Sequence, residues 1–307
     1  MIRKSTVATW ILTLPFVLAT SLTLGSRVQA ATYRLAVEPA YPPDQAAEVY
    51  KPLIDYLSRS TGHRFELVLV RDYHAYWREL RDNAPVDFAF DEAHFVDFRI
   101  QFHGFAPVAR TAEPTIYALI AQPDYEDQGI RVLIGQPVAC MPAPSLGFAL
   151  LAGMYQDNPL AQPSVRSEAA SWRDGAQMIF AGEVEGAMVP IHVAEEFYNL
   201  PTLARTEPLP GRAVTASPKV PAEVVSALAE ALASLHEDPD LYDVLAELGA
   251  TRFEPATAAE YAGKEKMLSG FYGYSKAVKA RAQQATEAGA DAESEAESEA
   301  ESGEETP

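Results

Sequence analysis

The chain has 307 residues, 48% of them hydrophobic and 22% charged, which is typical of a folded protein with one large or two modest domains. Its formal net charge of −19 argues against nucleic-acid binding, because that function needs clustered Lys and Arg. A single cysteine excludes an internal disulfide, and the six histidines show no metal-ligand spacing, so we predict no metal and no cofactor. The sequence lacks a nucleophile elbow, a dinucleotide-binding glycine motif and a Walker loop, which predicts that the protein is not an enzyme.

The N-terminal segment, residues 1–30, has the pattern of a secretory signal peptide. It begins with Arg3 and Lys4, continues as a mostly apolar run and ends in the small-x-small sequence Val28-Gln29-Ala30. A membrane anchor is the alternative, but the run is only about as long as the shortest spans. We therefore predict cleavage after this segment and a mature protein in the periplasm.

The C-terminal segment, residues 281–307, is acidic and of low complexity. From residue 287 onward it holds nine acidic residues and no basic residue. It offers too little apolar surface to offset the entropy cost of ordering it, which predicts a disordered acidic tail.

The segment after residue 30 alternates strand and helix patterns. A helix over 46–60 is predicted because Val49, Leu53 and Leu57 recur at helical spacing, and Gly62 can adopt the left-handed cap. The other elements expected here are strands over 33–37, 65–70, 86–90, 106–110 and 116–122 and a helix over 73–81. Repeated strand–helix units of this length predict a parallel sheet with helices on both faces.

A second series of elements predicts a second lobe. It consists of a strand over 138–141, helices over 146–155 and 172–180, a strand over 185–189, an extended return over 201–216 and helices over 220–235 and 241–248. We predict an α/β fold with two lobes, each with a central mostly parallel sheet and flanking helices, joined by two crossover strands. The first lobe is expected to comprise 31–117 and 208–280, and the second 118–207. Ligands bind between such lobes, at the carboxyl ends of the strands.

Several short segments, in order and at matching spacing, resemble one family. They are Pro52-Leu53-x-x-Tyr56-Leu57, then Thr61-Gly62, Asp72-Tyr73, and the stretch from Phe180 to Ala187. The chain resembles the phosphate/phosphite/phosphonate-binding proteins of ABC importers, which have the type II periplasmic binding protein fold. The resemblance covers residues 33 to about 250. It implies a periplasmic substrate-binding component that binds a small oxyanion between its lobes and delivers it to an ABC permease in the inner membrane.

The resemblance also implies a place for the ligand. The family holds its oxyanion at a helix start in the second lobe, which here corresponds to Ser145, Leu146 and Gly147, with phenolic contacts from Tyr73 and Tyr117. Free N–H groups and the positive end of the helix dipole favour an anion at such a place. An ordinary capped helix is the alternative.

This sequence departs from the family pattern at three places. The family's hydroxyl-rich run is reduced to Ser145, Ala118 stands where a Ser is typical, and the usual His is replaced by Ser171-Trp172-Arg173. Fewer hydroxyls mean fewer hydrogen bonds to a phosphoryl group. Trp172 could stack on a ligand or simply pack, and Arg173 could supply a positive charge.

Five further residues follow predicted strands and are candidates for ligand contacts. Tyr41 follows the first strand, and Asp91, Glu92 and His94 follow the third. Asp91 could bind an amine or cap the helix after it. His192 could face the cleft or lie on the surface of a helix.

Two other functions are possible on the same fold. One is a sensor subunit that reports its ligand to a membrane kinase, and the other is an enzyme. The second would need a catalytic cluster of titratable groups, which the sequence does not indicate. We expect a monomer without nucleic-acid partners.

Overall fold

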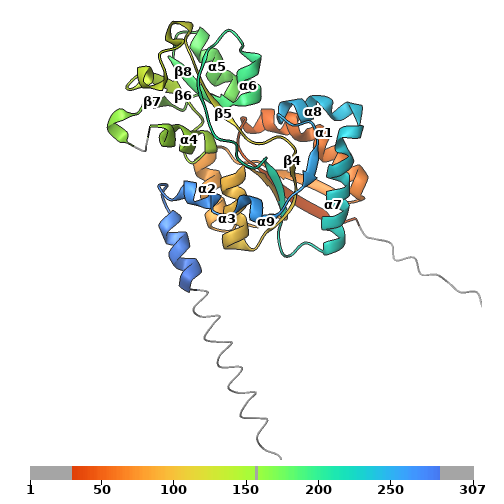
Figure 1. The fold of residues 1–307 in the computed structure, drawn as a ribbon. Coiled ribbons are helices and arrows are strands. Elements are labelled where there is room, and N and C mark those ends of the chain that lie inside the picture. The colour runs from red at the N-terminus through yellow and green to blue at the C-terminus, as the bar shows by residue number, and fades with distance from the viewer. Residues whose placement is uncertain (1–29, 156–157, 284–307) are drawn as a thin grey trace, which may run out of the picture. The chain divides into compact units, whose positions relative to one another are not determined.

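The computed structural model describes residues 30–155 and 158–283 (Figure 1). The predicted signal peptide, apart from its last residue, and residues 284–307 of the predicted tail lie outside the described residues. Residues 274–283 are helical, so the prediction of disorder is wrong for 281–283. Within the described residues, no helix is both long and apolar enough to cross a bilayer.

The first lobe contains a six-stranded sheet with the order β11-β4-β10-β3-β1-β2. Its strands are β1 (Thr32–Val37), β2 (Arg64–Val68), β3 (Phe88–Asp91), β4 (Ala106–Thr111), β10 (Ala213–Ala216) and β11 (Phe253–Pro255). β1 pairs parallel with β2 and β3, whereas β10 pairs antiparallel with β3 and β4. The four N-terminal strands therefore run in one direction, and their carboxyl ends lie along one edge of the sheet.

The second lobe contains a five-stranded sheet with the order β7-β6-β8-β5-β9. Its strands are β5 (Tyr117–Ala121), β6 (Pro137–Ala139), β7 (Ser164–Arg166), β8 (Gly186–Pro190) and β9 (Thr202–Arg205). Parallel pairs join β6 to β7 and β8, and antiparallel pairs join β5 to β8 and β9. Only β5 runs against the other four. The prediction of two α/β lobes is confirmed, and both sheets are mixed, because antiparallel strands accompany the parallel ones in each.

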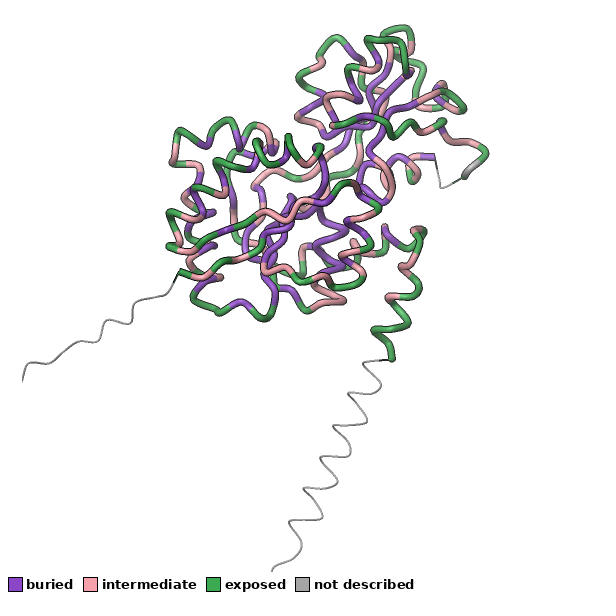
Figure 2. The backbone as a smooth tube through the Cα atoms, turned by 180° about the vertical axis from the view of Figure 1, so that it is seen from behind, coloured by how far each residue is buried: buried purple, intermediate pink, exposed green. Residues whose placement is uncertain are grey.

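Helices cover both sheets (Figure 1). They are α1 (Pro43–Thr61), α2 (Tyr73–Arg81), α3 (Ala93–His103), α4 (Leu146–Met154), α5 (Trp172–Phe180), α6 (Ile191–Glu196), α7 (Ala222–Ser234), α8 (Tyr242–Glu247) and α9 (Ala258–Tyr261). In the first lobe, α1 packs against α7 and α8, whereas α3 packs against α9. Figure 2 shows the buried residues along the strands and the exposed ones on the outer faces of the helices.

Local sequence signals explain where several helices begin and end. The bounds of α2 and α5 match the prediction, because Asp72 and Ser171 cap them by accepting hydrogen bonds from backbone N–H groups three residues on, at 2.8 and 3.2 Å. Gly62 closes α1 with φ 72°, a left-handed conformation that most other residues adopt only with strain.

Two extended segments join the lobes, between β4 and β5 and between β9 and β10. They lie side by side, because Thr115 and Leu209 form an antiparallel bridge with N–H to carbonyl distances of 2.9 and 3.0 Å. This confirms the two predicted crossover strands. β5 already begins at Tyr117, and the limits proposed for each lobe remain predictions.

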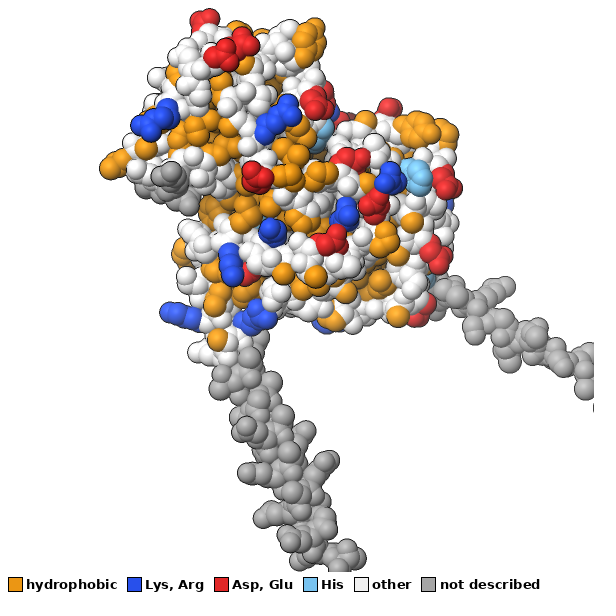
Figure 3. Space-filling model, in the orientation of Figure 1, with side chains coloured by type: hydrophobic (Ala, Val, Ile, Leu, Met, Phe, Trp, Pro, Cys, Tyr) orange, Lys and Arg blue, Asp and Glu red, His pale blue; other side chains and the backbone are white. Residues whose placement is uncertain are grey.

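The surface is mixed in charge. Figure 3 shows Lys and Arg side chains interspersed with acidic ones on the face in view, without a continuous basic patch.

Two neighbouring carboxyl residues, Asp97 and Glu265, connect the C-terminal part of the chain to α3. Asp97 of α3 is fully buried, and its Oδ2 accepts a hydrogen bond of 3.1 Å from the backbone N–H of Glu265. Burial and the neighbouring Asp97 raise the pKa of Glu265 to about 7, against a smaller opposite effect of Lys266. Tyr274 also faces the pair, and burial together with the two carboxyls raises its pKa.

We expect Glu265 to make the stability of the protein depend on pH. Its pKa is raised in the folded state, so its stabilising contribution is complete below its ordinary value of 4.5 and is lost as the pH rises through about 7. In Glu265→Gln the side chain is neutral at every pH. The Tm of this variant minus the Tm of the wild type should therefore be larger at pH 8 than at pH 5. The exposed Glu48→Gln is the control. A difference that is the same at both pH values would contradict the prediction.

Candidate functional site

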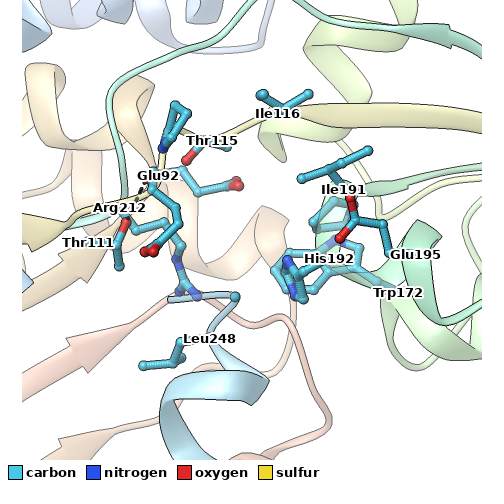
Figure 4. Close-up of a pocket in the computed structure, with 14 residues that line it drawn as sticks. Glu92, Thr111, Thr115, Ile116, Trp172, Ile191, His192, Glu195, Arg212 and Leu248 are labelled. Carbon is cyan, nitrogen blue, oxygen red and sulfur yellow. Dashed lines mark hydrogen bonds between the residues drawn. The ribbon is translucent and has the colours of Figure 1, made fainter. Parts of the chain in front are cut away.

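A pocket of about 170 Å³ lies where the two crossover segments pass between the lobes (Figure 4). It is lined by the ends of β4 and β8, the first crossover segment, residues of α5 and α6, and residues next to α3, α8 and β10. These residues are Glu92, Thr111, Glu113, Pro114, Thr115, Ile116, Trp172, Pro190, Ile191, His192, Glu195, Arg212, Leu248 and Gly249. Figure 4 shows Glu92, Thr111 and Arg212 on one side and Trp172, Ile191 and His192 on the other. The pocket is therefore shared by both lobes, at the carboxyl ends of strands, as expected for this fold.

Arg212 is the cationic group of the pocket. Its side chain is only 7% exposed and packs over the ring of Phe90, with Cζ 4.3 Å from the ring centroid. Burial opposes its charge, but Tyr50, Glu38 and Glu92 raise its pKa above the ordinary value, so it stays cationic. Its Nε and Nη2 are buried without a hydrogen-bond partner. A buried guanidinium with free donors is costly unless something in the pocket accepts from it.

Two buried carboxyl groups accompany this cation. Glu38 follows β1, and its carboxyl accepts hydrogen bonds from the backbone N–H of Glu92 and from the Tyr73 hydroxyl, the latter at 3.3 Å. The Tyr117 hydroxyl donates to Oε1 of Glu92 at 2.8 Å, whereas Oε2 of Glu92 is buried without a partner. Burial raises the pKa of both carboxyls.

The two carboxyls lie in different electrostatic surroundings. The pKa of Glu38 is raised well above its usual value by burial and by Glu92 and Asp91. The pKa of Glu92 is raised by burial but lowered by Arg212 and by hydrogen bonds from Tyr117 and Glu38. Arg212 thus opposes the effect of burial at both carboxyls.

The opposite side of the pocket is aromatic. His192 lies edge-on to Trp172, with ring centroids 6.4 Å apart. Burial and Arg212 lower the pKa of His192 to about 4, so the ring is neutral at neutral pH, and its buried Nε2 has no partner. Gly249 passes so close that a Cβ there would lie 2.4 Å from Nδ1 of His192. His192 therefore lines the pocket and is partly exposed, and its role as a ligand contact remains a prediction.

The predicted oxyanion cradle at the start of α4 does not line this pocket. Ser145 caps the helix by accepting from the Phe148 N–H at 3.2 Å, and it donates to the carbonyl of Met141 at 3.0 Å. Leu146 is fully buried, and a Cβ on Gly147 would lie 2.9 Å from the ring of Tyr117. Tyr117 therefore lies between the start of α4 and Glu92 in this conformation.

Asp91 is not available to a ligand, and it does not cap a helix. Its carboxylate accepts from Arg99 Nε at 2.6 Å and from the Tyr76 hydroxyl, and both partners are buried. Glu92, not Asp91, is the N-cap residue of α3, and its side chain makes no capping hydrogen bond. The cap prediction is wrong because β3 continues through Asp91, and the amine role has no free oxygen to support it.

The other predicted residues contact each other or the opposite lobe. Arg173 forms ion pairs with Glu196 at 2.7 Å and Glu247 at 2.5 Å, and Tyr41 donates a hydrogen bond to Glu247. His94 lies within 3.0 Å of the Pro144 carbonyl, and burial lowers its pKa to about 3, so its Nε2–H is the donor. The contacts of Arg173 with Glu247 and of His94 with Pro144 join the lobes, whereas the other two lie within one lobe. Tyr41, His94 and Arg173 do not line the pocket.

A family model described as an ABC transporter, phosphonate, periplasmic substrate-binding protein matches residues 35–261. This chain belongs to that family. The predicted transport function is therefore confirmed, and the family gives less support to a sensor or an enzyme. Membership implies a small-molecule ligand and a membrane permease as partners.

Solved structures show the same fold at low sequence identity. PhnD1 from Prochlorococcus marinus in complex with methylphosphonate aligns with a TM-score of 0.65 and 13% identity over 78% of this chain and 97% of that one. The binding protein component of an ABC phosphonate transporter from Pseudomonas aeruginosa gives 0.63 and 14% over 88% and 100%. A Xanthomonas citri protein bound to ATP gives 0.59 and 15% over 78% and 97%. No curated protein matches the chain in sequence.

Reasoning from the sequence missed the charged centre of this binding protein. Arg212 stands directly before a short strand in the Pro-rich return, and Glu38 directly after the first strand. The sequence pattern that could have indicated these two residues is a charged residue directly next to an apolar strand. Many acidic residues in this chain have the same pattern, so it does not single out a binding residue. Trp172 and His192 were found because each begins a helix or follows a strand at the inner edge of the second lobe.

Proposed function

We propose that this binding protein captures a small tetrahedral oxyanion of the phosphate, phosphite or phosphonate class in the pocket around Arg212. The observation that carries the proposal is the buried guanidinium whose Nε and Nη2 have no partner. Arg presents donors in a planar fork that matches two oxygens of such an anion. PhnD1, which shares the fold, forms a complex with methylphosphonate, and this is consistent with the same ligand class.

The start of α4 could add donors when the lobes move. Leu146 and Gly147 are the first two helical residues, whose N–H groups have no carbonyl of the same helix to bind. The ring of Tyr117 packs against Gly147 in this conformation. We propose that a ligand which draws Tyr117 away from this position gains access to these N–H groups, as the family resemblance implies.

The remaining parts of the proposal follow from the transport role. The signal peptide directs the chain to the periplasm and is removed, the protein is a monomer, and it catalyses no reaction. Ligand binding selects the closed arrangement of the lobes, which the permease then recognises. Arg173 and His94 support this arrangement because each contacts the other lobe.

A thermal-shift titration tests the proposed ligand class. The exported protein is heated with phosphate, phosphite, methylphosphonate or acetate. An oxyanion present at 100 times its Kd stabilises the fold by about 2.7 kcal/mol, which corresponds to a Tm increase of roughly 5–10 °C for a protein of this size. Acetate is expected to give no comparable shift. If none of the three phosphorus oxyanions raises Tm, the proposal is wrong.

A further inference from the structure

We propose that residues 262–274, which we call the C-terminal strap, restrain the opening of the two lobes. The strap contains the short 3₁₀-helix η6 (Lys264–Leu268). It is anchored on the first lobe and also contacts the second lobe. The family match ends at residue 261, so the strap lies outside the matched part of the chain. The inference concerns the movement of the lobes and does not depend on which ligand binds between them.

Several contacts hold the strap on the first lobe. η6 packs along α3, and its last residue, Leu268, is fully buried. The backbone N–H of Glu265 donates to Asp97 of α3 at 3.1 Å, and Nε1 of Trp77 in α2 donates to the carbonyl oxygen of Tyr272 at 2.8 Å. In Figure 1 this part of the chain runs in blue from α9 past α3 and α2. Hydrogen bonds near both ends of the strap therefore connect it to the first lobe.

Two side chains of the strap contact the second lobe. The ring of Phe271 lies edge-on to the ring of Phe148 in α4, with centroids 5.9 Å apart. Met267 packs against the apolar cluster of the second lobe that includes Leu119 and Leu146. The strap therefore connects α3 of the first lobe with α4 of the second.

The contact with the second lobe is limited in extent. A groove of about 870 Å³ lies between the strap, α4 and the second crossover segment, and residues of all three parts line it. Only part of the strap therefore packs directly on the second lobe, whereas hydrogen bonds and buried apolar surface hold it on the first. When the lobes separate, we expect the strap to stay on α3 and to lose the contacts of Met267 and Phe271.

These apolar contacts favour the arrangement in which the lobes touch. Separation exposes the rings of Phe148 and Phe271 to water, and this is unfavourable. The loss of one such aromatic pair shifts an equilibrium by about two- to tenfold. Two-lobed binding proteins take up and release their ligands by hinge opening. A strap that opposes opening therefore lowers the population of separated lobes and slows the release of a bound ligand.

Thiol labelling of the ligand-free protein tests the inference. His94 is fully buried and lies within 3.0 Å of the carbonyl oxygen of Pro144 in the other lobe, so His94→Cys should react only while the lobes are apart. Cys140→Ala in the same chain removes the native thiol. When the lobes close again faster than the thiol reacts, the labelling rate is proportional to the population of separated lobes, however small that population is.

Phe271→Ala in this background should label about two- to tenfold faster. Phe148→Ala should have the same effect, and the double variant should be no faster than either single variant, because both changes remove one shared contact. Tyr272→Ala is the matched control and should keep the background rate. The ring of Tyr272 is 90% exposed and lies against Arg81 of the first lobe, and its contact with Trp77 is made by the backbone.

Two results would overturn the inference. One is a labelling rate in Phe271→Ala that equals the background rate, and the other is an equal acceleration in the control variant. The measurement contains no ligand, so its outcome is independent of the oxyanion proposal, which the thermal-shift titration tests separately.

Discussion

Arg212→Met is expected to abolish the binding of phosphorus oxyanions. Each hydrogen bond from a charged donor contributes about 1.5–3 kcal/mol, so the loss of two such bonds should weaken Kd by at least about 100-fold. The Tm increase produced by methylphosphonate or phosphate should then disappear at concentrations that saturate the wild type. Calorimetric titration of both proteins gives the comparison.

The same change should also destabilise the unliganded protein. Removal of one partner from a buried charged group costs about 3 kcal/mol or more, and Glu92 would lose the cation that holds its pKa down. Arg212→Lys keeps the charge without the planar fork and is expected to fold with intermediate affinity. Arg131→Met, at an exposed arginine outside the pocket, should leave binding and stability unchanged. If Arg212→Lys and Arg212→Met both fold and both bind methylphosphonate as tightly as the wild type does, the proposed role of Arg212 is wrong.

Arg99→Met is expected to have the largest effect on stability without an effect on the ligand site. Its side chain is 5% exposed, and its Nε contacts Oδ2 of the fully buried Asp91 at 2.6 Å, while Nη2 donates to the Tyr76 hydroxyl at 3.1 Å. Loss of the guanidinium leaves a buried carboxylate without its cation, at a cost of about 3–5 kcal/mol. Tm should fall by roughly 6–20 °C, as measured by calorimetry or circular dichroism.

A double-mutant cycle separates this ion pair from general packing. Asp91→Asn together with Arg99→Met removes both charges, so the double variant should be less destabilised than the sum of the single variants. The exposed pair of Lys51 and Asp55, with side chains 70% and 49% exposed, is the control, and its cycle should give a coupling below about 1 kcal/mol. Additive effects at Asp91 and Arg99 would show that the two charges are not coupled.

The difference between Asp91 and Glu92 explains why neighbouring acidic residues could not be told apart in the sequence. Both follow an apolar strand in an acidic chain. Arg99, eight residues further on, and Tyr76 bind the two oxygens of Asp91, whereas Glu92 accepts a hydrogen bond from Tyr117 and lines the pocket with Arg212. That outcome depends on which way each side chain leaves the end of β3, and a charge pattern does not contain this information.

The sequence by itself determined the order and type of the elements, because hydrophobic periodicity and capping residues act locally. Asp72, Ser171 and Gly62 mark ends of helices that the structure reproduces, and the alternation of strands and helices predicted two α/β lobes with two crossovers. Only the tertiary structure decided the chemistry of the pocket. Glu38, Glu92 and Arg212 are far apart in the chain, and burial removes their water, so the fold alone determines in which direction each pKa moves and which atoms of Arg212 remain without a partner.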